Sequence, residues 1–528
     1  MARCLNILMD FANLFKAFIG VNYLSIAFAI SQSGIGLGII GLLLIALATV
    51  HCCHLLIKCK REVIQNIVQA NFPCENQPNS DEAHMRGILC SLLEKRLSYG
   101  DVASLVLGKF GTILVNFALL VTQFGFCVNY FIFLGNTFEK MFPHYLPYVA
   151  VVGSNSSTRA PAYEVFYQEL QIRDDIVHVS NSSTASYILP VSLVSKSPGY
   201  SILVLIPLPL FILFSYLRSV RHLGPVSVIA NIAIFIGYCS MLSYILTDFS
   251  VDDSISWFRF STFPIFFGQV TSSYEGIGTI IPIESSMEGN HTLFAPLLYL
   301  TIAVFTFVLG SMGFLGYLCL GTSTAQVLIW NLAPGSILEL LVSLVVCIGV
   351  LFTFPLQCFP IIEICEGLIF TQGTCKSCSP KVVNINSDSN EDTTEVMPPD
   401  SRQNEDELQQ LLQHPQVTPI LKMLPTATHI PQSVSAWKRN LLRASIVVAQ
   451  LGCAFALKDE FAYISALTGA IGSTLLGFVI PALLHIILKR RNLGTSVIMK
   501  DILLILFGIV GGISGVYASM LSIIQHFG

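Results

Sequence analysis

Charged residues are scarce in this sequence: Asp, Glu, Lys and Arg together make up 11% of its 528 residues. Soluble proteins carry about 25% charged residues, so a chain of this length has too little polar surface to be soluble. Hydrophobic residues make up 53%. They fall in blocks of about 20 residues or more, the length of a membrane-spanning helix. The composition therefore predicts an integral membrane protein embedded in the lipid bilayer.

The sequence also lacks the patterns of enzymes and of nucleic-acid-binding proteins. No basic run indicates a nucleic acid partner, and no nucleophile triad, phosphate-binding loop or metal-ligand cluster occurs. The 15 cysteines lie mostly inside apolar blocks, where thiols behave as small hydrophobic groups. Cys375 and Cys378 have the spacing of half a zinc knuckle without a second pair. We therefore expect no enzyme, no cofactor and no metal site.

Eleven apolar blocks follow one another along the chain. We expect each block to be a helix, because backbone polar groups in lipid have to be satisfied within the segment. The expected spans are 13–33, 35–57, 109–135, 199–217, 224–247, 263–284, 293–319, 336–359, 440–457, 461–487 and 500–525. The predicted fold is an all-α membrane protein with 11 transmembrane helices, which makes residues 1–528 one transmembrane domain.

Lysine and arginine determine the expected orientation of these helices. With the N-terminus in the cytosol, six of the 28 Lys and Arg residues fall outside and 22 fall inside. Many of the 22 lie close to helix ends, where the positive-inside rule applies best. This orientation gives a cytosolic loop at 60–108, an extracellular or lumenal loop at 136–198 and a second cytosolic loop at 371–436. The odd number of helices places the C-terminus outside.

Short motifs in these loops predict glycosylation and sorting. Asn155 and Asn181 begin Asn-x-Ser sequons in the outer loop, so both are expected to carry glycans. The second cytosolic loop is polar, with few aromatics, which is typical of disorder. Glu407, Leu411 and Leu412 have the spacing of an acidic dileucine signal, which would bind sorting adaptors and direct the protein to endosomes and lysosomes. A short amphipathic helix is the alternative interpretation.

Two of the predicted helices contain glycine in mid-span. Gly20, Val21 and Asn22 interrupt the first, and residues 272–278 interrupt the sixth. Small, helix-breaking residues at comparable places in two halves are typical of a transporter site. An unwound turn exposes backbone N–H and C=O groups, which suit the carboxylate and the ammonium of an amino acid.

Glycine also has a purely structural use, because it lets membrane helices pack closely. We adopt this interpretation for Gly469, Gly472 and Gly477 in helix ten. It suits helix six less well, because close packing gives no reason for a carboxylate such as Glu275 at that depth.

Charged residues inside spans mark further candidates, because they are costly in lipid and usually functional. Lys16 lies one turn before Gly20, and Glu275 lies within the interruption of helix six. The alternative for Lys16 is that its ammonium reaches the cytosolic interface. The alternative for Glu275 is that its carboxyl only braces the break through backbone hydrogen bonds. Glu284 is expected near the cytosolic rim.

Residues 273–287 resemble the FEGIGxxxPxExxM signature of the amino acid/auxin permease family, closest to its animal proton-coupled amino acid transporter branch. Four further segments are similar to that branch: 99–102, 123–126, 353–356 with Pro360, and 469–481. The match covers nearly all of the chain except the loops at 136–198 and 371–436.

The resemblance implies an inverted-repeat, LeuT-like fold. Helices 1–5 and 6–10 would form the two repeats, with helix 11 appended. The substrate would lie between the breaks in helices one and six, flanked by helices three and eight. The substrate-binding residues that follow are Gly20, Val21, Asn22, Tyr274, Glu275, Gly276, Ile277 and Gly278.

The chain departs from the family pattern in helix one. The second glycine and the proline of that pattern are replaced by Asn22 and Ala27, and Asn13 stands where the proton-coupled branch often has histidine. In sodium-coupled members, an asparagine at the position of Lys16 holds the ion together with a threonine that matches Thr353. Because an ammonium there repels sodium, we expect sodium independence. Protons are the expected coupling ion, with Lys16, Glu275 and Thr353 as the coupling residues and Glu275 as the candidate carrier.

The sequence thus predicts a proton-coupled, sodium-independent symporter of small neutral amino acids in the plasma membrane or an endolysosomal membrane. One alternative is an endolysosomal amino-acid sensor that signals through its cytosolic loops. Another is a facilitator of a different organic acid.

Overall fold

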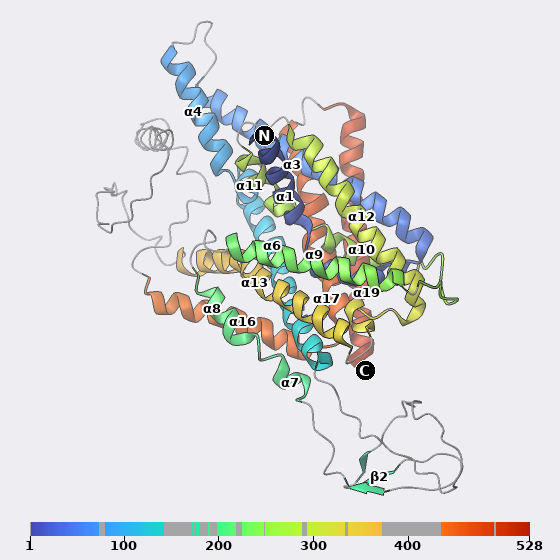
Figure 1. Cartoon of the computed structure of the whole chain (residues 1–528). Coiled ribbons are helices and arrows are strands. Elements are labelled where there is room, and N and C mark those ends of the chain that lie inside the picture. The colour runs from blue at the N-terminus through green and yellow to red at the C-terminus, as the bar shows by residue number, and fades with distance from the viewer. Residues whose placement is uncertain are drawn as a thin grey trace.

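The computed structural model describes most of the chain as a bundle of helices. Its N-terminal and C-terminal ends lie at opposite ends of this bundle (Figure 1). The described residues are 2–72, 80–141, 172–173, 176–178, 188–190, 198–217, 224–247, 249–287, 293–332, 336–371, 434–489 and 493–527.

The first half of the chain begins with a helix that is interrupted early. Its helices are α1 (Ala2–Phe18), η1 (Val21–Ser25), α2 (Ile26–Ser33), α3 (Ile35–Asn71), α4 (Ser80–Arg96), α5 (Tyr99–Leu107), α6 (Lys109–Met141), α7 (Tyr200–Leu203), α8 (Leu208–Ser215) and α9 (Gly224–Thr247). Three short strands form an antiparallel sheet in the order β1 (Ile172–Arg173), β2 (Ile176–His178), β3 (Ile188–Pro190).

The second half also begins with an interrupted helix. Its elements are α10 (Phe263–Ser273), α11 (Ile277–Ser286), α12 (Phe294–Leu320), η5 (Gly321–Ser323), η6 (Leu328–Asn331), α13 (Ile337–Thr371), α16 (Ala436–Ala456), α17 (Phe461–Thr468), η8 (Gly469–Ser473), η9 (Leu475–Val479), α18 (Ile480–Lys489) and α19 (Thr495–Phe527). The elements η8 and η9 are π-helical turns within one long helical stretch.

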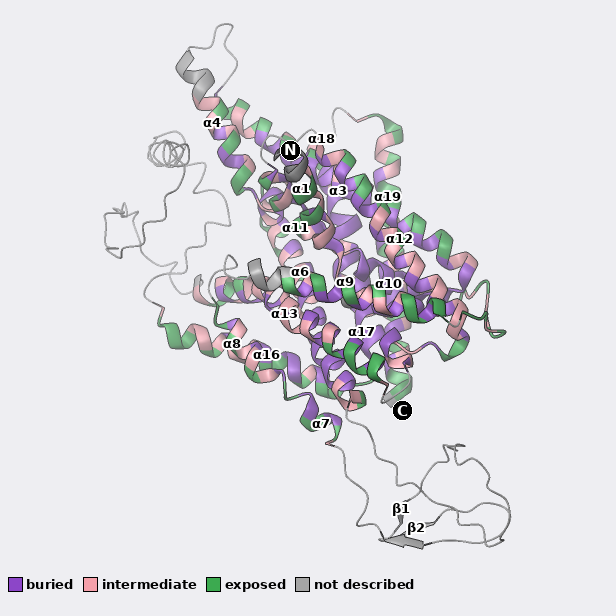
Figure 2. Ribbon diagram, in the orientation of Figure 1, coloured by how far each residue is buried: buried purple, intermediate pink, exposed green. Residues whose placement is uncertain are grey.

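The outer surface of the bundle is apolar, as a lipid-facing surface requires. On α19 the exposed fractions of Leu503, Val510, Ile513 and Tyr517 are 66%, 64%, 68% and 71%. Their spacing places them on one face of the helix, and buried residues concentrate in the interior of the bundle (Figure 2). Seven described helices are long and apolar enough to cross a membrane, and the bent pair in helix one makes eight. The chain is therefore a multi-pass membrane protein. The number 11 and the inverted repeat stay predictions.

The span predicted as helix ten, 461–487, corresponds to α17, η8, η9 and α18. The surroundings of its glycines test whether they serve close helix packing. A Cβ atom at Gly469 would overlap the carbonyl oxygen of Gly268 in α10, and one at Gly472 would overlap the hydroxyl of Thr122 in α6. Close helix packing is thus confirmed for these two positions. It is wrong for Gly477, whose Cβ would have no neighbour within 4 Å.

Much of the loop expected at 60–108 is helical. Helix α3 continues to Asn71, and α4 and α5 follow. Ser98 and Asp101 form a reciprocal capping box that begins α5. The hydroxyl of Tyr99 donates to the carbonyl oxygen of Leu476 in η9 at 2.9 Å. Because a π-helical turn leaves backbone groups without their usual helical partners, this side chain satisfies a carbonyl and anchors α5 to helix ten.

A buried ion cluster joins the two helices on either side of the 371–436 segment. Glu366 in α13 lies 2.6 Å from Arg443 Nε and 2.7 Å from Arg439 Nη2, both in α16. Glu366 and Arg443 are 1% and 3% exposed. Arg443 also donates to the carbonyl oxygens of Ser215 and Leu217 at 2.9 Å each. The cluster therefore holds α13, α16 and the end of α8 together.

Replacing Glu366 with glutamine should destabilise the protein, because the change leaves the buried guanidinium of Arg443 without its counter-charge. We expect Glu366→Gln to lower the free energy of unfolding by about 3 kcal/mol, measured by thermal unfolding in detergent. Lys458 and Asp459 form an exposed pair at 3.8 Å, so Asp459→Asn should change it by less than about 0.5 kcal/mol. Equal losses in the two variants would contradict this account.

Candidate functional site

The first break separates α1 from α2. Residues Ile7–Phe18 and Asn22–Ser33 meet at an angle of 51°. Gly20 is extended, with φ −142° and ψ −174°, and caps η1 without a side-chain hydrogen bond. The side-chain amide of Asn22 donates to the carbonyl oxygen of Ser272 at 3.4 Å and to its hydroxyl at 3.3 Å. The asparagine that replaces the second glycine of the family pattern thus connects this break to helix six.

The second break separates α10 from α11 at residues 274–276. Gly276 caps α11 without a side-chain hydrogen bond. A Cβ atom at Gly276 would lie 2.7 Å from Cδ1 of Phe18 and 2.8 Å from the carbonyl oxygen of Ala17. The breaks predicted in helices one and six are therefore present and in direct contact.

A cavity of about 90 Å³ lies between the two breaks and four further helices. Phe126, Asn129 and Tyr130 line it from α6, and Thr353, Leu356 and Gln357 line it from α13. Both triplets follow an i, i+3, i+4 spacing, so each helix presents one face to the cavity. Helix α9 adds Ala230, Asn231 and Ile234, and α12 adds Phe305.

Two charged residues of opposite sign line the cavity, Lys16 and Glu275. Neither side chain forms an ion pair or a hydrogen bond with another described residue. Lys16 lies in the last turn of α1, where its positive charge interacts favourably with the helix dipole. Both charges are thus open to a molecule in the cavity.

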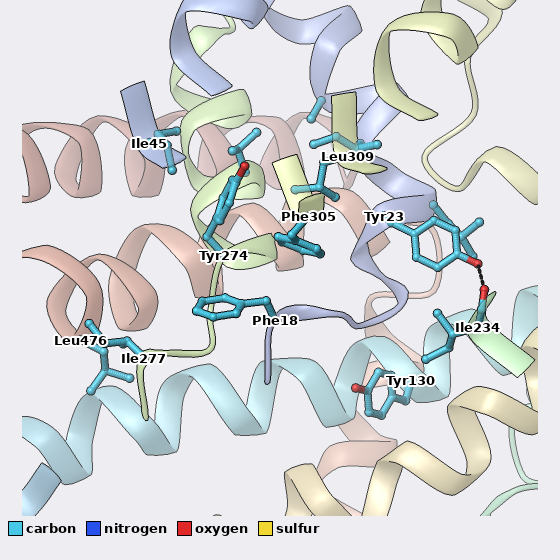
Figure 3. Close-up of a cluster of buried hydrophobic side chains, with 14 of the residues drawn as sticks. Phe18, Tyr23, Ile45, Tyr130, Ile234, Tyr274, Ile277, Phe305, Leu309 and Leu476 are labelled. Atoms are coloured by element: carbon cyan, nitrogen blue, oxygen red, sulfur yellow. Dashed lines mark hydrogen bonds between the residues drawn. The ribbon is translucent and has the colours of Figure 1, made fainter. Parts of the chain in front are cut away.

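Phe305 of α12 occupies the space between the two breaks. Its ring centroid lies 6.2 Å from that of Phe18 and 5.3 Å from that of Tyr274 (Figure 3). The hydroxyl of Tyr274 lies 2.6 Å from the hydroxyl of Thr306, so the tyrosine side chain is directed toward α12. On the other side, the hydroxyl of Tyr23 donates to the carbonyl oxygen of Ile234 at 3.1 Å. These contacts hold the unwound segments in place.

The predicted site residues divide into two groups. Those that line the cavity are Lys16, Gly20, Asn22, Glu275 and Thr353. Those that lie outside its lining are Tyr274, Gly276, Ile277 and Gly278. Ile277 is 2% exposed in the apolar core, and Gly278 faces Leu119. Val21 belongs to η1, but its side chain lies outside the described residues. The substrate-binding role of each residue stays a prediction.

Sequence reasoning missed three amide side chains of the lining, Asn129, Asn231 and Gln357. The signal was present, because each lies within an apolar block where a polar side chain is unusual. Asn129 follows the 123–126 motif of helix three, and Gln357 follows the 353–356 motif of helix eight. The motifs do not show that these amides face the cavity, because the face that each helix turns toward it depends on how the helices pack.

A second ion cluster lies where α11 meets α3 and α4. Lys60 Nζ lies 2.8 Å from Glu284 Oε2, and Arg61 Nη2 lies 2.9 Å from Glu284 Oε1. Lys60 is fully buried and also donates to the hydroxyl of Ser285 at 2.7 Å. That hydroxyl donates in turn to the carbonyl oxygen of Glu94 in α4 at 2.6 Å. The carboxylate of Glu284 therefore ties α11 to α3, unlike the unpaired Glu275.

Several predicted sites lie outside the described residues. They are the sequons at Asn155 and Asn181 and the sorting motif at Glu407, Leu411 and Leu412.

Two interrupted helices that enclose a polar cavity in a multi-pass membrane protein are the architecture of transporters with discontinuous helices. The sequence profile described as "Transmembrane amino acid transporter protein" matches residues 5–71, 88–158 and 177–521. The chain belongs to this family, and hence to a family of transporters rather than enzymes.

Named relatives agree with this assignment at low identity. Amino acid transporter AVT3C of Arabidopsis thaliana is 23% identical over 516 residues, which cover 97% of this chain and 89% of that protein. Amino acid transporter AVT3B of the same plant is 22% identical over 523 residues, covering 98% and 93%. Vacuolar amino acid transporter 4 of Saccharomyces cerevisiae is 23% identical over 440 residues, covering 81% and 50%.

The contact between the two breaks predicts different effects for two neighbouring glycines. Gly276→Ala places a methyl group against Phe18 and Ala17, and overpacking of this kind destabilises by about 1–3 kcal/mol. Gly278→Ala is the matched control, because the nearest atom to its Cβ is a side-chain carbon of Leu119 at 3.5 Å, an ordinary contact. Thermal unfolding in detergent should show a lower midpoint for Gly276→Ala only. Equal midpoints for the two variants would show that the breaks do not depend on this contact.

Proposed function

We propose that the protein is a secondary active symporter of small neutral amino acids, coupled to protons and independent of sodium. The observation that carries the proposal is the cavity between the two breaks, whose charged lining residues are Lys16 and Glu275. One charge of each sign matches a zwitterion without adding a preference for a charged side chain.

The breaks supply the groups that an amino-acid backbone needs. The N-terminal amides of η1 and α11 carry no side-chain cap and favour a carboxylate. The C-terminal carbonyls of α1 and α10 favour an ammonium for the same electrostatic reason. The aromatic and aliphatic walls, which include Phe126, Tyr130, Phe305 and Leu356, restrict the room for a side chain. This supports small neutral substrates.

The proposal that protons rather than sodium drive transport rests on three residues that line the cavity, Lys16, Thr353 and Glu275. The ammonium of Lys16 places positive charge in the environment of the Thr353 hydroxyl, and Coulomb repulsion in a medium of low dielectric disfavours a bound sodium ion. The carboxyl of Glu275 can take up and release a proton beside the substrate. The alternative, in which Glu275 only braces the break, lacks support, since its carboxyl bonds to no described backbone group.

We propose a location in the membrane of an acidic organelle, with the plasma membrane as the alternative. A yeast relative is named a vacuolar amino acid transporter, and an acidic compartment supplies a proton gradient. The termini lie at opposite ends of the bundle (Figure 1), which suits 11 spans, a cytosolic N-terminus and two five-helix repeats followed by a last helix. We also propose that Asn155 and Asn181 carry glycans and that sorting adaptors bind the 371–436 loop.

Flux through purified protein tests the function. Proteoliposomes should accumulate labelled alanine, glycine or proline when an inward proton gradient is imposed, and replacing sodium by choline at fixed pH should leave the rate unchanged. Empty liposomes are the control. Collapse of uptake in choline would contradict sodium independence. Binding of amino acids without flux would instead support the endolysosomal sensor, the alternative function. Uptake at the same rate with and without the proton gradient would support a facilitator.

Glu275→Gln separates the proton carrier from a structural brace. The amide keeps the shape of the carboxyl but cannot bind and release the transported proton, so accumulation driven by pH should disappear while amino-acid exchange continues. Glu339→Gln is the matched control, because Glu339 is a carboxyl that is only 4% exposed and lies outside the cavity lining. Initial rates with and without a gradient provide the measurement. An unchanged pH dependence in Glu275→Gln would reject the carrier role.

A further inference from the structure

We propose that Asn129 recognises the substrate's side chain, and that the cavity therefore selects amino acids with a carboxamide side chain, asparagine or glutamine. This inference narrows the substrate class within the proposed function and rests on it. It concerns a residue on α6, away from the two breaks that offer backbone groups to the zwitterion.

Asn129 is a buried amide that no described residue satisfies. The residue is 1% exposed, and it lines the cavity together with Phe126 and Tyr130. Neither Nδ2 nor Oδ1 has a hydrogen-bond partner. A buried donor and a buried acceptor without partners lower the stability of the folded protein, because each has lost its hydrogen bonds to water. The residue is therefore poorly explained by packing alone.

The other amides of the lining differ from Asn129. Asn22 donates to Ser272, and the side chain of Gln357 interacts with Tyr130. Asn231 is only partly buried. Among the described lining residues, Asn129 alone is an amide that is buried and has both polar atoms unpartnered. It is thus the group with hydrogen-bonding capacity left for a ligand.

Asn129 lies where it can contact the substrate's side chain, whereas the two breaks contact the substrate's carboxylate and ammonium. Asn129 lines the cavity from α6 together with its neighbour Tyr130, which Figure 3 shows beside that helix. Helix α6 forms one wall of the cavity, and the breaks form another. A substrate whose carboxylate and ammonium bind at the breaks therefore directs its side chain toward the remaining walls, which include Asn129.

The chemistry of the free amide identifies the preferred side chain. A carboxamide has one acceptor oxygen and an NH₂ donor group, so two carboxamides can form two reciprocal hydrogen bonds. A hydroxyl can satisfy only part of this capacity. An apolar side chain leaves both atoms of Asn129 unpaired, and sites built to hydrogen-bond a substrate discriminate strongly against analogues that cannot. Asparagine should therefore bind better than leucine, which has a similar shape.

Competition in proteoliposomes tests the inference with the full-length protein. Unlabelled asparagine and leucine compete with labelled alanine, and the ratio of their half-inhibitory concentrations measures discrimination. We expect wild type to favour asparagine by about tenfold or more. Asn129→Leu and Asn129→Ala should each lower this ratio by about tenfold.

Gln450→Leu is the matched control. Gln450 on α16 is fully buried and has both amide atoms unpartnered, but it lies outside the cavity lining. Its replacement should leave the ratio unchanged. A wild-type protein that does not favour asparagine, or Asn129 variants that keep the wild-type ratio, would overturn the inference.

The same proteins distinguish this inference from the transport proposal. If wild type shows no flux, thermal shifts with asparagine and leucine still measure selectivity, and a selective shift would reject transport but retain the role of Asn129. If both Asn129 variants fail to fold, the wild-type ratio alone decides, because a preference for leucine is incompatible with recognition by a free amide.

Discussion

The structure depends on one constraint, that backbone polar groups inside a bilayer need partners within the protein. A continuous helix satisfies its own backbone polar groups, whereas the two interrupted spans contribute partners to each other. Asn22 in the first break donates to Ser272 in the sixth helix, and Gly276 lets the second break lie against Phe18. Each break is thus sheltered by the other, and residues of both breaks line the cavity.

Charge is distributed according to the same constraint. Glu284 and Glu366 are buried, and each binds two basic side chains that hold helices together. Lys16 and Glu275 line the cavity without such partners. An unpaired charge at that depth is costly, and this contrast is the basis on which we propose that the two groups bind a transported molecule and its coupling ion. Pairing thus distinguishes the carboxylates that join helices, Glu284 and Glu366, from Glu275 in the cavity lining.

The breaks themselves were predictable, because glycine, asparagine and a carboxylate in mid-span oppose a continuous apolar helix. The packing role of Gly469 and Gly472 was predictable as well, since small residues at helix contacts have few other uses in a membrane. Gly477 shows the limit of this reasoning, because its sequence context is similar and yet nothing lies close to it. The amides at Asn129, Asn231 and Gln357 were visible as polar residues in apolar blocks, but their common cavity was not.

Composition and periodicity determined that the chain is a membrane protein, which segments are apolar helices and where two of them break, but not that much of 60–108 is helical. These properties are local, because they follow from the bilayer's thickness and from the backbone's need for hydrogen bonds. Tertiary structure alone decided which side chains meet. It directs Tyr274 toward Thr306, pairs Glu284 with Lys60 and leaves Asn129 without a partner in the cavity. Such contacts join residues up to hundreds of positions apart, so no local pattern specifies them.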